Sequence, residues 1–138
     1  MKADIAIKYH PDNKNRPLIE QISLALARNG IESVCVVRDL ENWGEVHFSP
    51  EDLMQKSFAA IDACDLMVVD LSEKGVGVGI EAGYAWARGI PILTIARAGA
   101  DISETLQGIS QAVFWYESGD ALVELFTRID FLPRPGAG

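Results

Sequence analysis

The chain has 138 residues, of which 49% are hydrophobic and 23% charged, a balance typical of one globular domain with its own core. Its formal net charge of −8 argues against wrapping a nucleic acid polymer, but it leaves open a small anionic ligand held by backbone amides. No apolar stretch approaches the roughly 20 residues of a membrane span and no secretory segment leads the chain, so we expect a cytoplasmic protein without a membrane partner.

Strand-like and helix-like patterns alternate through the first part of the chain. Pro17 suits a helix start, and the apolar residues after it recur at helical spacing. β-branched residues then favour a second strand. The predicted elements are a strand starting at residues 5–7, a polar loop at 9–16, a helix from Pro17 to a C-cap at Asn29 and Gly30, a strand at 31–37 and a loop at 38–48.

The same alternation continues to the end of the chain. Ser49 and Pro50 read as an N-cap followed by proline at the first helical position. The continuous apolar run at residues 65–71 is typical of a central parallel strand covered on both faces. The predicted elements are a helix from Ser49 to about 63, the strand at 65–71, a glycine-rich loop, a helix at about 78–88, a strand at 91–96, a short helix at 103–108, a strand at 112–116 and an amphipathic helix at 120–131.

This order of elements predicts an α/β fold built from right-handed βαβ units. We expect a doubly wound, five-stranded parallel sheet in the order 2-1-3-4-5, a flavodoxin-like or Rossmann-like three-layer sandwich. Residues 1–132 would form this single domain, and residues 133–138 a flexible tail. In such a sheet the ligand lies beyond the carboxyl ends of strands one and three, where the loops at 9–16 and 72–79 meet.

The glycine-rich loop carries the strongest indication of chemistry. Gly75, Gly77 and Gly79 would let a ligand approach the backbone closely, and the helix start offers free N–H groups to an anion. Glu81 is predicted in the first turn, where the helix dipole favours an ionised carboxylate that is competent as a nucleophile. The alternatives are an ordinary solvated glutamate and glycines that serve close helix–strand packing.

The segment Gly77-x-Gly79-x-x-Ala82 also matches a dinucleotide-binding fingerprint. Its context differs, because the loop follows the third predicted strand rather than the first. Glu81 would moreover place negative charge beside a pyrophosphate. We therefore expect no dinucleotide and no other cofactor.

The remaining polar candidates each have a functional and a structural interpretation. His10 lies in a loop at the predicted site and either contacts ligand or is solvated, and its spacing from His47 supports no metal site. Asp70 either acts as an acid, or orients a bound ligand, or caps the following loop through its own backbone. Cys35 and Cys64 lie in apolar runs and are expected to be buried, reduced thiols.

Taken together, these motifs resemble the nucleoside 2-deoxyribosyltransferase superfamily, and within it the 2′-deoxynucleoside 5′-phosphate N-hydrolases. The similarity extends from about residue 17 to 131. The segments that carry it are residues 65–70, 75–85, 89–93, 103–108 and 113–116.

The resemblance implies that Glu81 attacks the anomeric carbon of a small-molecule nucleoside or nucleotide. The glycosyl-enzyme ester would then be resolved by water in a hydrolase, or by another base in a transferase. Ser103 is implied to contact a 5′-phosphate, in some members from a neighbouring subunit, and its alternative is a helix N-cap. The resemblance also implies a homodimer through the helices at about 50–63 and 78–88. Tyr9, His10, Gly75, Gly77 and Gly79 complete the expected substrate-binding set.

Three positions depart from the pattern of the family. Residues 9–12 replace a Gly-Ser-rich turn, and Gly75 stands where the hydrolases often have serine. Ser57 occupies the place of an aspartate that faces the nucleophile, although Asp52 and Asp62 lie nearby. An alternative is therefore a catalytically impaired nucleotide-binding module of the same fold. The sequence leaves open whether the protein is a hydrolase or a transferase, and the short length of the chain slightly favours the hydrolase.

Overall fold

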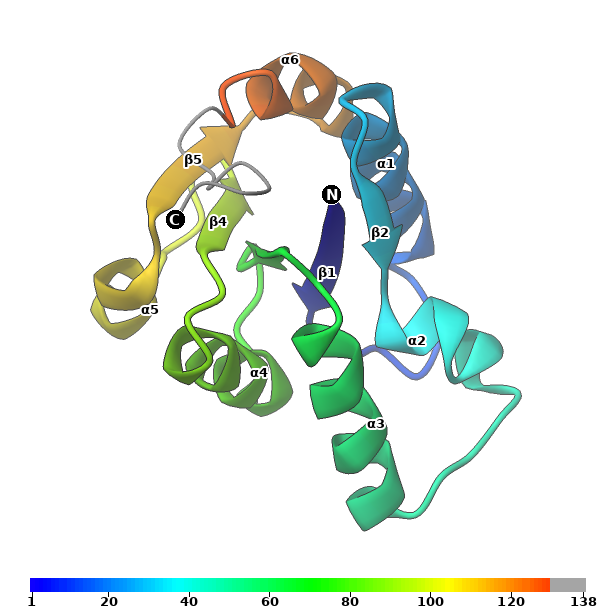
Figure 1. Cartoon of the computed structure of the whole chain (residues 1–138). Helices are drawn as coiled ribbons and strands as arrows, with labels where there is room; N and C mark the ends of the chain where they lie inside the picture. The colour runs from blue at the N-terminus through cyan, green and yellow to red at the C-terminus, as the bar shows by residue number, and fades with distance from the viewer. Residues whose placement is uncertain (130–138) are drawn as a thin grey trace.

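Five parallel strands form one sheet in the order β2-β1-β3-β4-β5 in the computed structural model of the chain, which describes residues 1–129 (Figure 1). The strands are β1 (Lys2–Ile7), β2 (Glu32–Val34), β3 (Leu66–Asp70), β4 (Ile92–Arg97) and β5 (Ala112–Tyr116). The predicted fold class and strand order are thus confirmed. The predicted tail at 133–138 and the last residues of the predicted final helix lie outside the described residues.

Helices cover both faces of the sheet and complete the predicted three layers. Figure 1 shows α1 and α6 on one side, and α3, α4 and α5 on the other. The helices are α1 (Arg16–Arg28), α2 (Val36–Asp39), α3 (Pro50–Asp62), α4 (Val76–Ala87), α5 (Glu104–Ile109) and α6 (Leu122–Phe126), with single 3-10 turns η1 (Asn42–Gly44) and η2 (Gly119–Ala121). Among residues 1–129, no helix is both long enough and apolar enough to cross a membrane.

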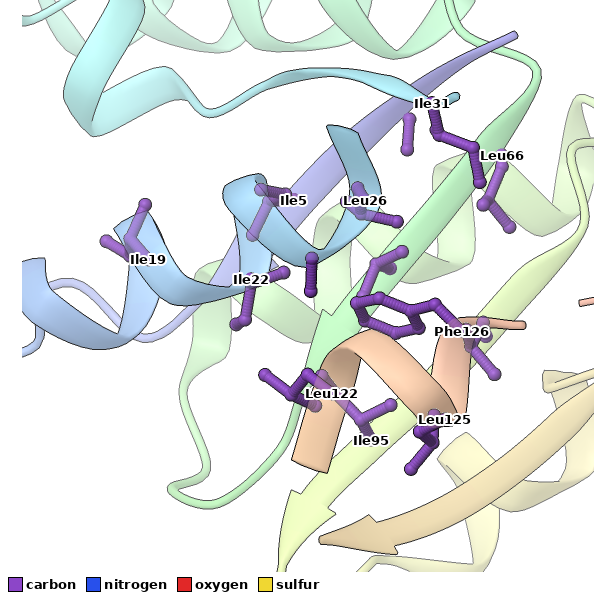
Figure 2. Close-up of a cluster of buried hydrophobic side chains, with 14 of the residues drawn as sticks. Ile5, Ile19, Ile22, Leu26, Ile31, Leu66, Ile95, Leu122, Leu125 and Phe126 are labelled. Atoms are coloured by element: carbon purple, nitrogen blue, oxygen red, sulfur yellow. The ribbon is translucent and has the colours of Figure 1, made fainter. Parts of the chain in front are cut away.

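Each face of the sheet has its own apolar core, because successive side chains along a strand point to opposite faces. Figure 2 shows the first core, in which Leu26 of α1 and Phe126 of α6 pack near Ile5 of β1. On the other face, Val78 and Ala82 of α4 pack against Ala6 of β1. Whether a strand residue is odd or even in its strand therefore decides which face of the sheet, and which set of helices, its side chain meets.

The second strand is shorter than predicted. The pattern at residues 31–37 suggested one continuous strand, whereas β2 ends at Val34 and α2 begins at Val36. The Asp39 carboxylate accepts a hydrogen bond from the Cys35 backbone N–H over 2.8 Å, and Arg38 donates to the Ser33 carbonyl over 3.1 Å. These local bonds stabilise a helical turn after an edge strand, which within residues 1–129 pairs with β1 alone.

Other predictions made from local signals agree closely with the structure. Ser49 caps α3, with its hydroxyl accepting from the Asp52 N–H over 3.2 Å. Cys35 and Cys64 are buried free thiols, and burial raises the pKa of each to about 12. In contrast, α4 begins at Val76, two residues before the predicted start. That small difference changes the position of Glu81 within the helix.

Candidate active site

A cavity of about 510 Å³ opens at the carboxyl end of β1, where the sheet order reverses. This volume lies within the usual range for small-molecule sites, and the place is the one that the doubly wound fold predicts. Its walls come from β1, α2, α3 and the start of α4. The lining residues are Ile5, Ile7, Lys8, Tyr9, Cys35, Val36, Val37, Glu41, Leu53, Met54, Ser57, Gly75, Val76, Gly77, Val78 and Glu81.

Glu81 lies half-buried on the α4 wall of this cavity. Because α4 begins at Val76, Glu81 lies in the second turn rather than in the predicted first turn. Burial, followed by the negative charge of Asp4, raises the pKa of Glu81 from 4.5 to about 8. The expectation that the helix dipole keeps this carboxylate ionised is therefore wrong for the free protein, because the dipole acts mainly within the first turn and desolvation outweighs it.

The glycine-rich loop leaves the start of α4 open on the cavity side. Gly75 is the N-cap, and both Gly75 and Gly77 line the cavity, whereas Gly79 does not. A Cβ atom built on Gly77 or Gly79 would meet no atom within 4 Å, so close helix–strand packing does not account for these two glycines. At Gly75 the nearest atom would be Lys8 Cγ at 3.4 Å.

The loops after β1 and β3 meet, as the predicted topology requires. His10 Nε2 lies 3.0 Å from Glu73 Oε2, and Lys8 Nζ lies 3.7 Å from the same oxygen. Tyr9 lines the cavity and is largely exposed. His10 is held by Glu73 and is not among the residues that line the cavity.

Asp70 is not among the residues that line the cavity. It shares the parity of Leu66 and Val68, which pack on the α1 and α6 side, and it is 1% exposed. Its carboxylate accepts from the Ser72 N–H over 2.9 Å and from the Tyr116 hydroxyl. This geometry matches the structural interpretation of Asp70 as a cap of the following loop, not that of an acid facing the substrate.

The two serines singled out from the sequence lie in different places. Ser57 lines the cavity, but its hydroxyl donates to the Leu53 carbonyl over 2.8 Å. Ser103 is the N-cap residue of α5, makes no side-chain cap bond and lies outside the lining of the cavity. No carboxylate of α3 lines the cavity either, because Glu51 and Asp52 are exposed and Asp62 bonds Tyr84 and Arg88.

Two acidic residues near the cavity were missed by sequence reasoning. Glu41, which follows α2, lines the cavity, and burial raises its pKa. Asp4 lies in β1, is 1% exposed, and has a carboxylate oxygen Oδ1 without a hydrogen-bond partner in residues 1–129. A charged residue inside the apolar run of β1 was the available signal for Asp4. Nothing in the pattern of the predicted loop at 38–48 distinguished Glu41.

A second hollow, of about 580 Å³, lies near the amino end of β4 and beside α5. It has no ionisable side chain, so it lacks the groups that acid–base or nucleophilic chemistry needs. Its lining residues are Trp86, Gly89, Ile90, Pro91, Ile92, Gly108, Ile109, Ser110 and Gln111. Within the described part of the chain, no group of three His, Cys, Asp or Glu side chains could hold a metal ion.

The fold and the cavity define an α/β domain with a cavity of small-molecule size at the carboxyl edge of its sheet, beside a glycine-rich helix start and a glutamate. Within this class, the family model described as nucleoside 2-deoxyribosyltransferase matches residues 6–128, and the chain belongs to that family. The family is named for deoxyribosyl transfer on nucleosides, and the similar proteins include an N-hydrolase, an N-glycosidase and a deoxyribosyltransferase.

Comparison with individual proteins supports the same placement. A protein of Syntrophotalea carbinolica, provisionally named 2′-deoxynucleoside 5′-phosphate N-hydrolase 1, is 46% identical over 41 residues. The match covers 30% of this chain and 29% of the length of that protein. This short match therefore supports membership of the family and does not indicate a particular substrate.

Two solved structures show the same fold. The CMP N-glycosidase BcmB of Clostridium botulinum has a TM-score of 0.68 and 20% identity, over 92% of this chain and 98% of that one. A 2-deoxyribosyltransferase of Bacillus psychrosaccharolyticus has a TM-score of 0.70 and 16% identity, over 89% and 90% of the two chains. At such identities the likeness establishes the architecture, whereas chemistry has to be argued from the side chains.

Proposed function

We propose that this chain cleaves the N-glycosidic bond of a nucleoside or its 5′-monophosphate through a covalent intermediate on Glu81. The observation that carries this proposal is the position of Glu81, a half-buried carboxyl group on the wall of a nucleoside-sized cavity. The open start of α4 lies in the same wall. A nucleophile and an anion-binding helix start are thus presented to one ligand.

In the proposed reaction, an ionised oxygen of Glu81 bonds to the anomeric carbon as the bond from that carbon to the base nitrogen breaks. The electron pair leaves with the base, which takes up a proton from water. A water molecule then attacks the anomeric carbon, which frees the Glu81 carboxylate and releases one proton. In a transferase, a second base would take the place of water. The carboxylate also stabilises the positive charge that develops on the sugar.

The other walls suit the remaining parts of a nucleotide. The wall formed by Val36, Val37, Leu53 and Met54 is apolar and fits the faces of a planar base. The backbone at residues 75–77 lines the cavity and suits a 5′-phosphate. Lys8 lines the same cavity, and its ammonium group, which is paired with Glu73 over 3.7 Å, could exchange that partner for the phosphate. Tyr9 stands at the exposed rim, where it can cover a bound ligand.

A nucleotide-binding module with impaired turnover is the second candidate. The observation that favours it is the α3 wall, where Ser57 bonds the Leu53 carbonyl and no carboxylate faces Glu81. In this case the protein would bind nucleotides tightly without releasing base. The affinity would then depend little on whether residue 81 is glutamate or glutamine.

Free-base release from deoxynucleosides and their 5′-monophosphates tests the first candidate. We expect release by the native protein, and a loss of about a thousandfold or more in Glu81→Gln, since the nucleophile would be gone. Glu124→Gln removes an exposed carboxylate from α6, on the opposite face of the sheet, and should leave the rate unchanged. Intact-mass analysis of rapidly quenched enzyme should show the glycosyl ester.

The outcomes separate the candidates. Full activity in Glu81→Gln would refute the role of Glu81, whereas tight binding without base release in the native protein would establish the binding module. Labelled free base added to the assay distinguishes the two reactions. Incorporation of the label into nucleoside identifies a transferase, and base release without incorporation identifies a hydrolase.

The chain is also proposed to act as a homodimer through α3 and α4. Large apolar side chains are exposed on α4, with Val76 82%, Ile80 48% and Trp86 60% exposed. Ser103 lies outside the cavity of its own chain, so a phosphate contact from Ser103 would have to reach the cavity of a partner. The buried free thiols Cys35 and Cys64 fit a reducing compartment such as the cytoplasm.

A further inference from the structure

Glu41 is an acidic residue of the cavity lining that the proposed reaction does not use. It follows α2, which ends at Asp39, and its backbone is fixed on both sides. Its N–H donates to the Val36 carbonyl over 3.0 Å, and its own carbonyl accepts from the N–H groups of Gly44 and Val46, each over 3.0 Å. The backbone of Glu41 therefore has a defined place next to Val36.

The carboxyl group of Glu41 has no bonded partner of its own. Within residues 1–129 it makes no hydrogen bond and no ion pair, although the charge of His47 acts on it. Arg38, three residues earlier, donates instead to Asp39 and to Ser23, each over 2.8 Å. Burial raises the pKa of Glu41, against the lowering effect of His47. Because a carboxyl group is costly to remove from water without a new hydrogen bond, a ligand that donates one would offset that cost.

Other hydrogen-bonding side chains of the cavity lining already have a partner or a proposed role. Lys8 is paired with Glu73 over 3.7 Å and suits a phosphate. The Ser57 hydroxyl donates to a backbone carbonyl of α3 over 2.8 Å. Glu81 is the proposed nucleophile for the sugar. Glu41 thus remains as an acceptor for a part of the ligand that these residues do not serve.

The neighbours of Glu41 on the cavity lining indicate which part of the ligand that is. Val36 and Val37 of α2 line the cavity together with Leu53 and Met54 of α3, and these side chains suit the faces of a planar base. A base whose faces lie against apolar side chains has its polar groups at its edge, in the plane of the ring. Glu41 lines the same cavity and is bonded through its backbone to Val36, so its carboxyl group can meet that edge.

We propose that Glu41 selects the base, because its carboxylate accepts a hydrogen bond from an exocyclic amino group of cytosine or adenine. This inference rests on the proposed function. An ionised carboxylate has acceptor oxygens and no donor. Uracil and hypoxanthine have a carbonyl oxygen in place of the amino group, so two acceptors would meet and both would stay unpaired. A site built to bond an N–H group discriminates against an analogue that lacks it for this reason.

Equilibrium binding to the Glu81→Gln variant tests this selection without turnover. Two pairs of 2′-deoxynucleoside 5′-monophosphates match in shape and differ in the amino group: those of cytosine and uracil, and those of adenine and hypoxanthine. Calorimetry should show tighter binding of the amino member of at least one pair, by about tenfold or more. When Glu41→Gln is added, this ratio should fall to about threefold or less, because an amide both donates and accepts.

Glu45→Gln is the matched control. Glu45 is an exposed acid in the same segment, lies outside the cavity lining, and accepts a hydrogen bond from the Asn42 side chain over 2.6 Å. Its change removes the same charge and should leave the ratio unchanged. Equal affinities within both pairs, or a ratio that persists in Glu41→Gln, would overturn the inference. An equal loss of affinity for both members of a pair would also overturn it, because Glu41 would then act on the sugar, the phosphate or the shape of the cavity.

The inference and the proposed function can fail separately. Discrimination within a pair, without base release by the native protein, would reject the proposed chemistry and keep the role of Glu41. Base release with the same kcat/KM for both members of each pair would do the reverse.

Discussion

Tyr116 at the end of β5 donates its hydroxyl hydrogen bond to the Asp70 carboxylate at the end of β3, across the intervening strand β4. The Ser72 hydroxyl lies 3.2 Å from the same phenolic oxygen and accepts from the Arg97 N–H over 2.9 Å. Burial, followed by the bond to Asp70, raises the pKa of Tyr116. This network anchors the start of the glycine-rich loop through residues that do not line the cavity.

Tyr116→Phe should therefore destabilise the fold and spare the chemistry. Loss of one hydrogen bond to a buried carboxylate should lower the free energy of unfolding by about 1–3 kcal/mol. We expect kcat for base release to stay within a few-fold of the native value at a temperature where the variant is folded. Urea denaturation and the base-release assay make the two measurements. A thousandfold loss of kcat in Asp70→Asn with unchanged stability would instead restore a catalytic role for Asp70.

Activity should rise with pH up to about pH 8. The pKa of Glu81 in the free protein is raised to about 8, and only its ionised form attacks the sugar. Below that value the ionised fraction, and with it kcat/KM, should fall about tenfold per pH unit. A deoxynucleoside is the better probe here, because the second ionisation of a 5′-phosphate near pH 6 would overlap the profile. A kcat/KM that begins to fall only near pH 4 to 5 would contradict a Glu81 carboxyl group whose pKa is raised by desolvation.

The variant Gly77→Ala tests whether Gly77 is needed for the close approach of a ligand or for packing of the protein. A Cβ at Gly77 meets no atom within 4 Å, and the backbone φ there is not positive, so stability should be unchanged or higher by about 0.5–1 kcal/mol. Because the methyl group projects at a cavity-lining position, KM for a 5′-monophosphate should rise by about tenfold or more. Gly108→Ala in α5 is the matched control, with equally open space outside the cavity. An unchanged KM in Gly77→Ala would place the phosphate elsewhere.

Ile80→Glu should dissociate the proposed dimer. Ile80 is 48% exposed on α4, and a carboxylate there would have to be desolvated in an apolar interface. Sedimentation velocity should show a native dimer and a monomeric variant. Leu24→Glu on α1 is the matched control, because Leu24 is 52% exposed on the other face and its change should leave the dimer intact. A monomeric native protein would reject this interface.

Local patterns in the sequence were sufficient for most of the architecture. The apolar run at 65–71 and the segment at 112–116 correspond to β3 and β5, and the Ser49 cap starts α3 as predicted. The alternation of elements then led to the strand order, because parallel βαβ units have few allowed arrangements. Glu81 could also be found from the sequence, because the glycines that mark its loop are its neighbours in the chain.

The electrostatic state of the site was decided by tertiary structure alone. Asp70 faces the core under α1 and α6, and Asp4 faces the core under α4, the helix that carries Glu81, because the pairing of β1 with β3 sets the parity of both strands. The raised pKa of Glu81 depends on desolvation by segments far away in sequence and on the charge of Asp4. A sequence specifies which acids exist, but their distances and solvent exposure arise only when distant elements pack together.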